Sequence, residues 1–379
     1  MTKKPNPSEN SQSTKDTKAP SLPPGLGRGG PASYASKMMR SIVESTPTMD
    51  AKLDLSDLPD IRRPNLSGID IVVPEPALTE DIVMESLEIL YYNHAERTIR
   101  EAGEAVEFGD ELRVDWVGFI EGKLLPFSPE EDLIIRLEED MMYPGFGQAL
   151  KGSLVGDTAN ISITFPDDHD IEVFRNRTAV FVVQIKAAAT PAFIDPNSPE
   201  MLERIGRGNT LKEVVQSITE ELEEFNANAM VLAAIDMTLE KLCQRVTVSV
   251  PEHFIDEEIR FWWRSAEGDF LHEKGLERQD IDDALQAWLQ DEETREEAER
   301  RLKIAMVVKA FVKEQLEEIQ QEELMGFLDE FSETLGVDAE EWRQVLSQDQ
   351  AEQESLLDKY LYMRTISHIM GEVNVQYGG

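Results

Sequence analysis

The pattern of apolar and polar positions changes along the chain, and between residues 104 and 188 its period is two. Apolar residues alternate with polar ones at 112–116 and at 161–165, and a nearly continuous apolar run covers 180–185. Such alternation is typical of half-buried strands, whereas a short apolar run between turn residues suits a fully buried strand. The segment is therefore predicted to form a small antiparallel β-rich domain with one short helix near residues 145–150.

A helical period dominates the rest of the chain after residue 191. Thr210 is a good N-cap, and the apolar residues that follow it step alternately by four and by three. These residues are Leu211, Val215, Ile218, Leu222, Phe225, Ala229 and Leu232. This spacing predicts a long helix with an apolar seam for another helix. Further helices are predicted at about 293–335, 339–346 and 350–370.

The segment before the β-rich region is predicted to be an extended linker followed by a helix. Apolar residues alternate at 69–73, and four prolines between residues 59 and 76 keep their neighbours away from helical geometry. Thr79 is the predicted N-cap of an amphipathic helix that runs to about residue 101. Residues 1–50 are rich in Ser, Pro, Gly and Lys, which predicts a disordered, mildly basic tail.

The predicted fold is thus an α+β multidomain protein in which a small antiparallel β domain is inserted beside a mostly α-helical domain. The tail is expected at residues 1–50 and the linker with its helix at 51–103. The β domain is expected at 104–190 and the helical domain at 191–379.

Composition narrows the classes of function. The net charge of −38 argues against nucleic acid and against an anionic membrane surface as partners. Cys243 is the single cysteine, so no disulfide can form within the chain. The chain has no apolar run of about 18 residues and no apolar segment typical of a secretory signal. A cytoplasmic location is expected.

The β-rich segment carries a specific series of motifs. Val-Asp-Trp-Val-Gly at 114–118 is followed by Tyr-Pro-Gly-Phe-Gly-Gln-Ala-Leu-Lys-Gly at 143–152, Val-Gly-Asp at 155–157 and Ile-Thr-Phe-Pro at 163–166. In this order and spacing they resemble the FKBP-type peptidyl-prolyl isomerase domain of the trigger factor family. The resemblance implies an FKBP-like fold and prolyl isomerase activity, without any metal or cofactor.

The resemblance extends to the helical region. The long helix after Thr210, and Val-Ser-Val-Pro at 248–251 leading into Ile-Asp-Glu-Glu-Ile at 255–259, are similar to the substrate-binding domain of the family. The family's ribosome-docking loop is not recognisable. Residues 25–31 are either an ordinary Gly/Pro linker or a degraded form of that loop. Unfolded or nascent polypeptides are the partners that the resemblance implies, and ribosome association is expected to be weak.

Matched position by position, the family pattern implies a proline pocket with Phe146 as its floor. The implied walls and rim are Trp116, Leu133, Met142, Tyr143, His169 and Phe181. The chain departs from the family at Leu125 and Pro126, where Phe and an acidic residue are typical, and Phe127 could compensate by filling the pocket. Two interpretations stay open: a pocket that binds proline peptides, or a plain β-domain core.

The helical region holds a run of three aromatic residues, Phe261, Trp262 and Trp263. Because successive helical residues differ by about 100° around the axis, at least one of them is expected to be exposed or to face a cleft. Aromatic stripes of this kind are more often core, but an exposed apolar patch with an acidic rim would suit weak capture of unfolded chains.

Two functions from different classes follow. The first is a trigger-factor-like chaperone with a prolyl isomerase domain of full or reduced activity. The alternative is a non-catalytic scaffold for one dedicated partner protein. The acidic-rich loop at 167–170 resembles a metal site in composition only, because adjacent loop residues rarely converge on one ion. No metal site and no cofactor are predicted.

Overall fold

The computed structural model describes most of the chain. The described residues are 58–125, 127–139, 145–168, 174–315 and 350–378, with the single residues 141, 326 and 340. The tail predicted at 1–50 lies outside the described residues. So do the helix predicted at 339–346, except residue 340, and the part of the predicted 293–335 helix beyond residue 315, except residue 326.

The β domain is one antiparallel sheet in which β7 and β3 are the central strands. The strand order is β2-β7-β3-β4, while β5 pairs with β3 and β6 with β7. The strands are β2 (Glu96–Ile99), β3 (Glu111–Ile120), β4 (Lys123–Leu124), β5 (Glu130–Arg136), β6 (Thr158–Thr164) and β7 (Thr178–Ala192). The short helix α3 (Phe146–Leu150) packs on β6, which confirms the predicted helix at 145–150.

The helical part begins after β7 and contains one helix far longer than the others. The helices are α4 (Pro199–Ile205), α5 (Leu211–Gln244), α6 (Glu252–Trp263), α7 (Asp269–Glu273), α8 (Arg278–Gln290), α9 (Glu292–Gln315) and α12 (Gln350–Glu372). A π-helical turn, η4 (Arg264–Gly268), joins α6 to α7. Thr210 caps α5 as predicted, since its hydroxyl accepts the Glu213 N–H at 3.3 Å.

The linker forms a strand that pairs with the end of the chain. β1 (Asp70–Val73) lies parallel to β8 (Asn374–Tyr377), and its buried residues Ile71 and Val73 pack in the same apolar cluster as parts of α5, α9 and α12. The alternation at 69–73 therefore predicted the strand correctly. The pairing of residues about 300 positions apart was not visible in the sequence.

The helix predicted to run to residue 101 ends earlier. α2 (Glu80–Asn93) begins after its predicted N-cap Thr79 and stops at His94, and the next residues form β2. β2 adds to the edge of β7, where Glu96 pairs with Ala192. The prediction was wrong at this end because pairing to β7 overrides the local helical pattern.

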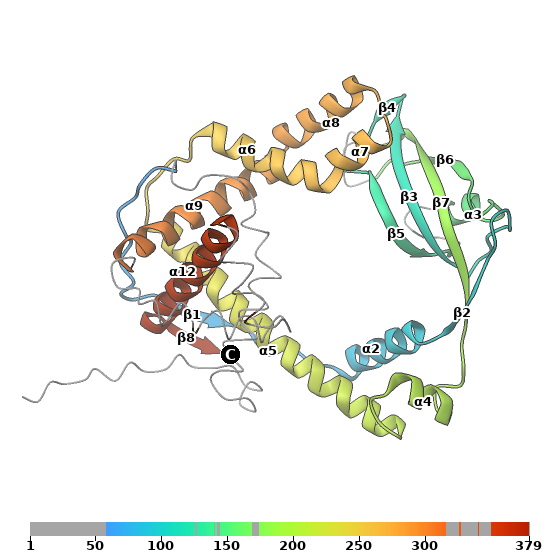
Figure 1. The fold of residues 1–379 in the computed structure, drawn as a ribbon, viewed down its shortest axis with the longest axis horizontal. Helices are drawn as coiled ribbons and strands as arrows, with labels where there is room; N and C mark the ends of the chain where they lie inside the picture. The colour runs from blue at the N-terminus through green and yellow to red at the C-terminus, as the bar shows by residue number, and fades with distance from the viewer. Residues whose placement is uncertain are drawn as a thin grey trace, which may run out of the picture.

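The described elements follow one another around a ring (Figure 1). α2, α4 and α5 lie on one side, and β2 leads from α2 into the β sheet. On the opposite side, η4, α7 and α8 reach the sheet at β3 and β4. We call residues 263–290, which comprise the last residue of α6 and these three elements with the turn between them, the helical tip. The β domain thus contacts the helical part at both ends of its own sheet.

Candidate functional site

Three aromatic side chains converge in the interior of the β domain. Trp116 comes from β3, Phe181 from β7, and Phe146 is the first residue of α3. The ring centroids of Phe146 lie 5.9 Å from Trp116 and 5.6 Å from Phe181, both edge to face. All three side chains are buried, and Phe146 is 0 % exposed. Edge-to-face packing contributes about 0.5–1.5 kcal/mol per pair beyond simple burial. We call this group the aromatic trio.

Two glycines place Phe146 at the start of its short helix. Gly145 has a φ of 86°, a left-handed value that L side chains rarely adopt, and it turns the chain into α3. Gly147 lies so close to the strand end that an added Cβ would meet the carbonyl oxygen of Glu138. Gly145 and Gly147 are therefore needed at these positions because they let α3 pack closely against the segment that follows β5.

The structure brings together four of the implied pocket residues. Leu133, on β5, is half-buried against the same cluster and lies opposite Val114 in the sheet. With the aromatic trio it lines one side of the β-domain core. Met142, Tyr143 and His169 lie outside the described residues, as does Pro126, so their predicted roles at the rim stay predictions.

Leu125 occupies the place next to the trio. It is buried in the same cluster, and Cδ2 of Leu125 and Cε1 of Phe181 lie 3.2 and 3.0 Å from a Cβ built on Gly118. Position 118 therefore requires a glycine, because any side chain there would crowd Leu125 and Phe181. Phe127 does not fill the pocket as proposed from the sequence. It is 52 % exposed and packs instead against Trp288 of α8, with ring centroids 4.8 Å apart and the rings tilted by 30°.

The outer face of the sheet is covered by the helical tip. Val117 and Leu124 of the sheet share an apolar cluster with residues of the tip. The buried tip residues are Trp263, Phe270, Leu271, Ile281 and Ala284. β3 is consequently buried on both faces from Val114 to Gly118 instead of on one. The sequence carried no sign of this contact beyond the unusually apolar character of the strand.

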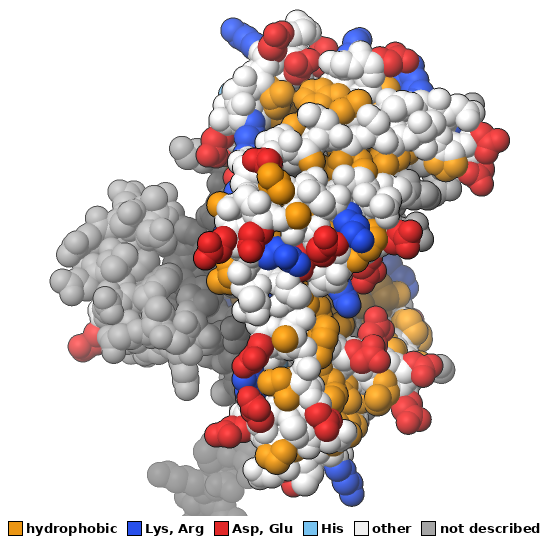
Figure 2. All heavy atoms as spheres, turned by 90° about the vertical axis from the view of Figure 1, so that its right-hand side faces the viewer, with side chains coloured by type: hydrophobic (Ala, Val, Ile, Leu, Met, Phe, Trp, Pro, Cys, Tyr) orange, Lys and Arg blue, Asp and Glu red, His pale blue; other side chains and the backbone are white. Residues whose placement is uncertain are grey.

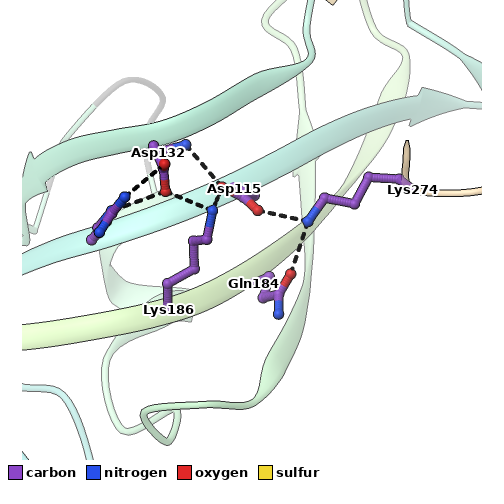
Figure 3. A network of polar contacts seen from close by, with 6 residues as sticks. Asp115, Asp132, Gln184, Lys186 and Lys274 are labelled. Carbon is purple, nitrogen blue, oxygen red and sulfur yellow. Dashed lines mark hydrogen bonds and ion pairs between the residues drawn. The ribbon is translucent and has the colours of Figure 1, made fainter. Parts of the chain in front are cut away.

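A polar network borders this apolar contact (Figure 3). Asp115, 2 % exposed, accepts from Lys186 of β7 at 2.9 Å and from Lys274 of the tip at 2.6 Å. It also accepts the Asp132 backbone N–H at 2.8 Å, and Lys274 reaches Gln184 at 3.1 Å. Burial alone would raise the pKa of Asp115, but these hydrogen bonds together with the charge of Lys274 hold it below its ordinary value.

Asp132 completes the network on the exposed side. It pairs with Arg113 and Lys186, which lower its pKa to about 2. The network therefore places two ionised carboxylates between three cations, one of which comes from the helical domain. Its arrangement suits an interdomain contact and no acid–base chemistry, because neither carboxylate would hold a proton near neutral pH.

A second acid at the contact has no such partners. Glu267, in η4, is 3 % exposed, and burial raises its pKa to about 7. The Trp288 indole N–H and the Phe127 backbone N–H lie near enough to oppose this shift in part. Neither of them meets hydrogen-bond geometry, so both Glu267 carboxylate oxygens are unpartnered within the described part of the chain.

The aromatic run on α6 divides between two environments. Trp263 is buried in the cluster between tip and sheet, and its ring lies against Gly268, where an added Cβ would be 2.8 Å away. Phe261 and Trp262 are half-buried, and Arg301 lies over the Trp262 ring at 4.9 Å. Trp263 thus has a packing role at the domain contact, and substrate capture by the other two stays a prediction.

The described residues contain neither a candidate metal site nor a helix that could span a membrane. No group of three or more His, Cys, Asp or Glu side chains there could hold a metal ion. None of the helices described combines the length and the apolar character needed to cross a bilayer.

Comparison with known proteins defines the class. Residues 210–371 match the family model described as bacterial trigger factor protein (TF) C-terminus. The trigger factor of Geobacillus sp. (strain WCH70) is 25 % identical over 296 residues, which cover 76 % of this chain and 67 % of the relative. The trigger factor of Shouchella clausii (strain KSM-K16) is 26 % identical over 294 residues, which cover 76 % of this chain and 66 % of the relative.

A further relative and one solved structure cover more of the chain. The trigger factor of Caldanaerobacter subterraneus subsp. tengcongensis is 26 % identical over 320 residues, covering 84 % of this chain and 73 % of its own. A structure described as "Promiscuous Substrate Recognition in Folding and Assembly Activities of the Trigger Factor Chaperone" is 18 % identical with a TM-score of 0.33, covering 82 % of this chain and 72 % of that one.

The protein is therefore an α+β multidomain protein with a helical, chaperone-like domain and a small β sheet. Its residues 210–371 match the model of the bacterial trigger factor C-terminus, and the relatives above are trigger factors, which confirms the resemblance to the trigger factor family. The matched segments span about two thirds of the length of the first two relatives.

Proposed function

We propose that this protein is a chaperone of the trigger factor type, which binds unfolded polypeptides and whose β domain binds and isomerises X-Pro bonds. The observation that supports the isomerase most directly is the aromatic trio next to Leu125, in which Gly145 and Gly147 position Phe146. An apolar site suits this reaction because isomerisation needs no nucleophile and no cofactor.

The barrier to be lowered is the partial double bond of the imide, about 18–20 kcal/mol in water. Conjugation is lost in the twisted transition state, which is less polar than the planar imide. A water-free aromatic pocket would therefore favour the twisted form over the planar one. Trp116, Phe146 and Phe181 would supply the apolar surface for the proline ring.

The helical part would capture the unfolded chain. Large apolar side chains are exposed on α2 and α5 and near the ends of β2 and β7, among many acidic residues. They are Ile82, Met84, Ile89, Ile99, Phe193, Phe225 and Met237. On the side of the molecule shown in Figure 2, apolar patches alternate with charged side chains. Exposed apolar surface with an acidic surround would suit weak and promiscuous contacts with unfolded chains where these side chains form continuous patches.

A refolding assay limited by prolyl isomerisation tests the isomerase. Phe146→Ala removes the central ring of the trio and is expected to abolish acceleration of refolding. Phe165→Ala is the matched control, because Phe165 is equally buried in the same domain but stacks on Phe174, outside the trio. Each truncation is expected to cost about 3–5 kcal/mol, so folding of both variants is checked first. A folded Phe146→Ala variant with full activity would exclude the pocket.

The scaffold alternative is favoured by one observation. Phe146 is wholly buried, as an ordinary core residue would be, so a peptide reaches it only if its surroundings move. If the protein is a scaffold, the unmodified protein should leave the rate of proline-limited refolding of a test protein unchanged. Deletion of residues 104–188, with a flexible linker between the ends, then separates the domains. For a chaperone, suppression of aggregation should largely survive this deletion.

A further inference from the structure

The face of the sheet that meets the helical tip has a regular pattern of side chains. Because alternate residues of a strand point to the same face, Asp115, Val117 and Phe119 of β3 all face the tip. Asp115 accepts from Lys274 at 2.6 Å. Val117 is buried, and Phe119 half-buried, in the apolar cluster shared with the tip. The tip therefore contacts one extended segment through an acid and two apolar side chains at alternate positions.

The tip offers a surface that matches this pattern. Phe270, Leu271 and Ile281 are buried in the shared cluster. Lys274 lies over the Phe270 ring at 5.2 Å, and Figure 3 shows it reaching from the tip to Asp115 and Gln184 of the sheet. We call Phe270, Leu271, Lys274 and Ile281 the tip surface. Its cation favours an acidic residue in a bound segment, and its apolar side chains favour apolar residues beside that acid.

The chain does not join the tip to the sheet where they touch. It enters the β sheet at Glu96 and leaves it at Ala192, and these two residues pair with each other at the other end of the sheet. There, Arg204 of α4 pairs with Glu96 at 2.5 Å, and the Arg97 guanidinium donates to the Asn93 carbonyl at 3.2 Å. The β domain can therefore separate from the tip while its connections to α2 and α4 stay in place (Figure 1).

Several buried polar groups of the tip lack hydrogen-bond partners. They are the indole N–H groups of Trp263 and Trp288 and both carboxylate oxygens of Glu267, as far as the chain is described. Trp263 and Trp288 belong to the cluster shared with the sheet. An unpaired buried polar group is costly, and it regains hydrogen bonds when water reaches it. The contact is thus weaker than its apolar surface alone would make it, which suits a contact that opens.

We propose that the tip surface binds extended segments of unfolded polypeptides and that β3 blocks it as an internal ligand. The segment that fits carries an acidic residue followed by apolar residues two and four positions later, as β3 does from Asp115 to Phe119. The contact between tip and sheet is therefore autoinhibitory, and opening of the ring frees the tip surface. This inference rests on the proposed capture of unfolded chains and adds the sequence pattern and the regulation of one capture site.

Fluorescence anisotropy of a labelled peptide measures access to the tip surface in the full chain. The peptide contains Asp-Ser-Val-Ser-Phe, and the matched peptide contains Ser-Asp-Val-Ser-Phe, which turns the acid to the other side of an extended segment. Val117→Lys puts a charge into the contact from the sheet side and leaves the tip surface unchanged. It should raise the affinity for the first peptide by about tenfold or more, because apparent affinity follows the fraction of molecules whose site is free. The matched peptide should gain much less.

Three further variants control for indirect effects. Phe270→Ser opens the contact by altering the tip surface itself, so it should give no gain in peptide affinity. Asp115→Asn removes the charge that Lys274 meets and should give a several-fold gain, which serves if Val117→Lys does not fold. Asp110→Asn is its matched control, because Asp110 is equally buried in the β domain but pairs with Arg100 of the same domain. It should leave peptide affinity unchanged.

Small-angle scattering shows whether the ring opens. The radius of gyration should rise in Val117→Lys and Phe270→Ser and stay unchanged in Asp110→Asn. A radius that rises in none of the variants would overturn the proposal. An opened Val117→Lys protein without a gain in peptide affinity would overturn it too, as would equal gains for both peptides or an equal gain in Phe270→Ser.

Suppression of aggregation separates this inference from the proposed function on which it rests. Val117→Lys should protect a denatured test protein at a lower concentration than the unmodified protein does, because its tip surface is free. If neither protein suppresses aggregation, the proposed chaperone function fails. The peptide measurement then still decides whether β3 blocks the tip surface.

Discussion

At the scale of single residues, the buried acids at the domain contact behave in opposite ways. Asp115 accepts hydrogen bonds from two lysines and a backbone N–H, so its pKa is lowered despite burial. Glu267 has no such partners, and its pKa is raised to about 7. The difference lies in the donors around each carboxylate, since both are almost completely buried.

Asp115→Ala is expected to destabilise the protein by about 1–3 kcal/mol, because it leaves two lysines and the Asp132 N–H without their acceptor. Lys274→Met should cost less than about 1 kcal/mol, since the Lys274 side chain is about one third exposed and Asp115 keeps Lys186 and the Asp132 N–H as donors. Urea unfolding measures both. An equal loss of unfolding free energy in the two variants would show that the Lys274 contact accounts for nearly all of the stability that Asp115 contributes.

Cys243 provides a prediction at the same scale. It is half-buried on α5, and burial together with Glu240 raises its pKa to about 11. Because the thiolate is the reactive form, Cys243 should react with a maleimide at pH 8 at least tenfold more slowly than a free thiol of ordinary pKa. In urea the rate should rise to that of the free thiol. Fast labelling of the folded protein would contradict the burial seen here.

At the scale of elements, α5 departs from the seam that its spacing predicts. Ile218 is buried as expected, but Phe225, in the middle of the seam, is 67 % exposed. The first turns of α5 pack with α2 and α4, and the later turns with β1, α9 and α12. The buried face changes where the neighbours change. The spacing therefore identified the helix correctly, but the identity of its partners was set elsewhere in the chain.

Replacement of Phe225 by Ser is expected to change the free energy of unfolding by less than about 0.5 kcal/mol, as usual for an exposed site. It should lower suppression of aggregation if this surface contacts unfolded chains. Ile218→Ala is the contrasting variant and should cost about 2–4 kcal/mol. Light scattering of a denatured test protein and urea unfolding supply the two measurements. Destabilisation by Phe225→Ser would show that a packing partner covers it.

At the scale of the whole molecule, the ring depends on the contact between the helical tip and the sheet. Glu267 makes this contact sensitive to pH. In the docked state its pKa is about 7, against an ordinary value of about 4.3 for an exposed glutamate, so docking favours the protonated acid. Docking of the tip on the sheet is therefore strongest at pH values below the ordinary pKa of glutamate. It weakens as the pH rises towards 7 and changes little above pH 7.

The radius of gyration from small-angle scattering should accordingly be larger at pH 8 than at pH 5.5, and Glu267→Gln should remove this difference. Other charged groups at the contact are Glu130, Lys274, Asp115, Lys186 and His272, which the variant leaves intact. A pH dependence that persists in Glu267→Gln would assign it to one of these groups instead.

The sequence by itself determined the local elements, and its resemblance to the trigger factor family implied the three residues of the aromatic trio. Alternation predicted the strands, Thr79 and Thr210 predicted helix starts, and the motif around Phe146 predicted α3, because each depends on neighbours close in the chain. Only the tertiary structure decided the end of α2 at Asn93, the pairing of β1 with β8 and the contact of Phe127 with Trp288. These depend on contacts between distant segments, and local periodicity carries no information about which surfaces will meet.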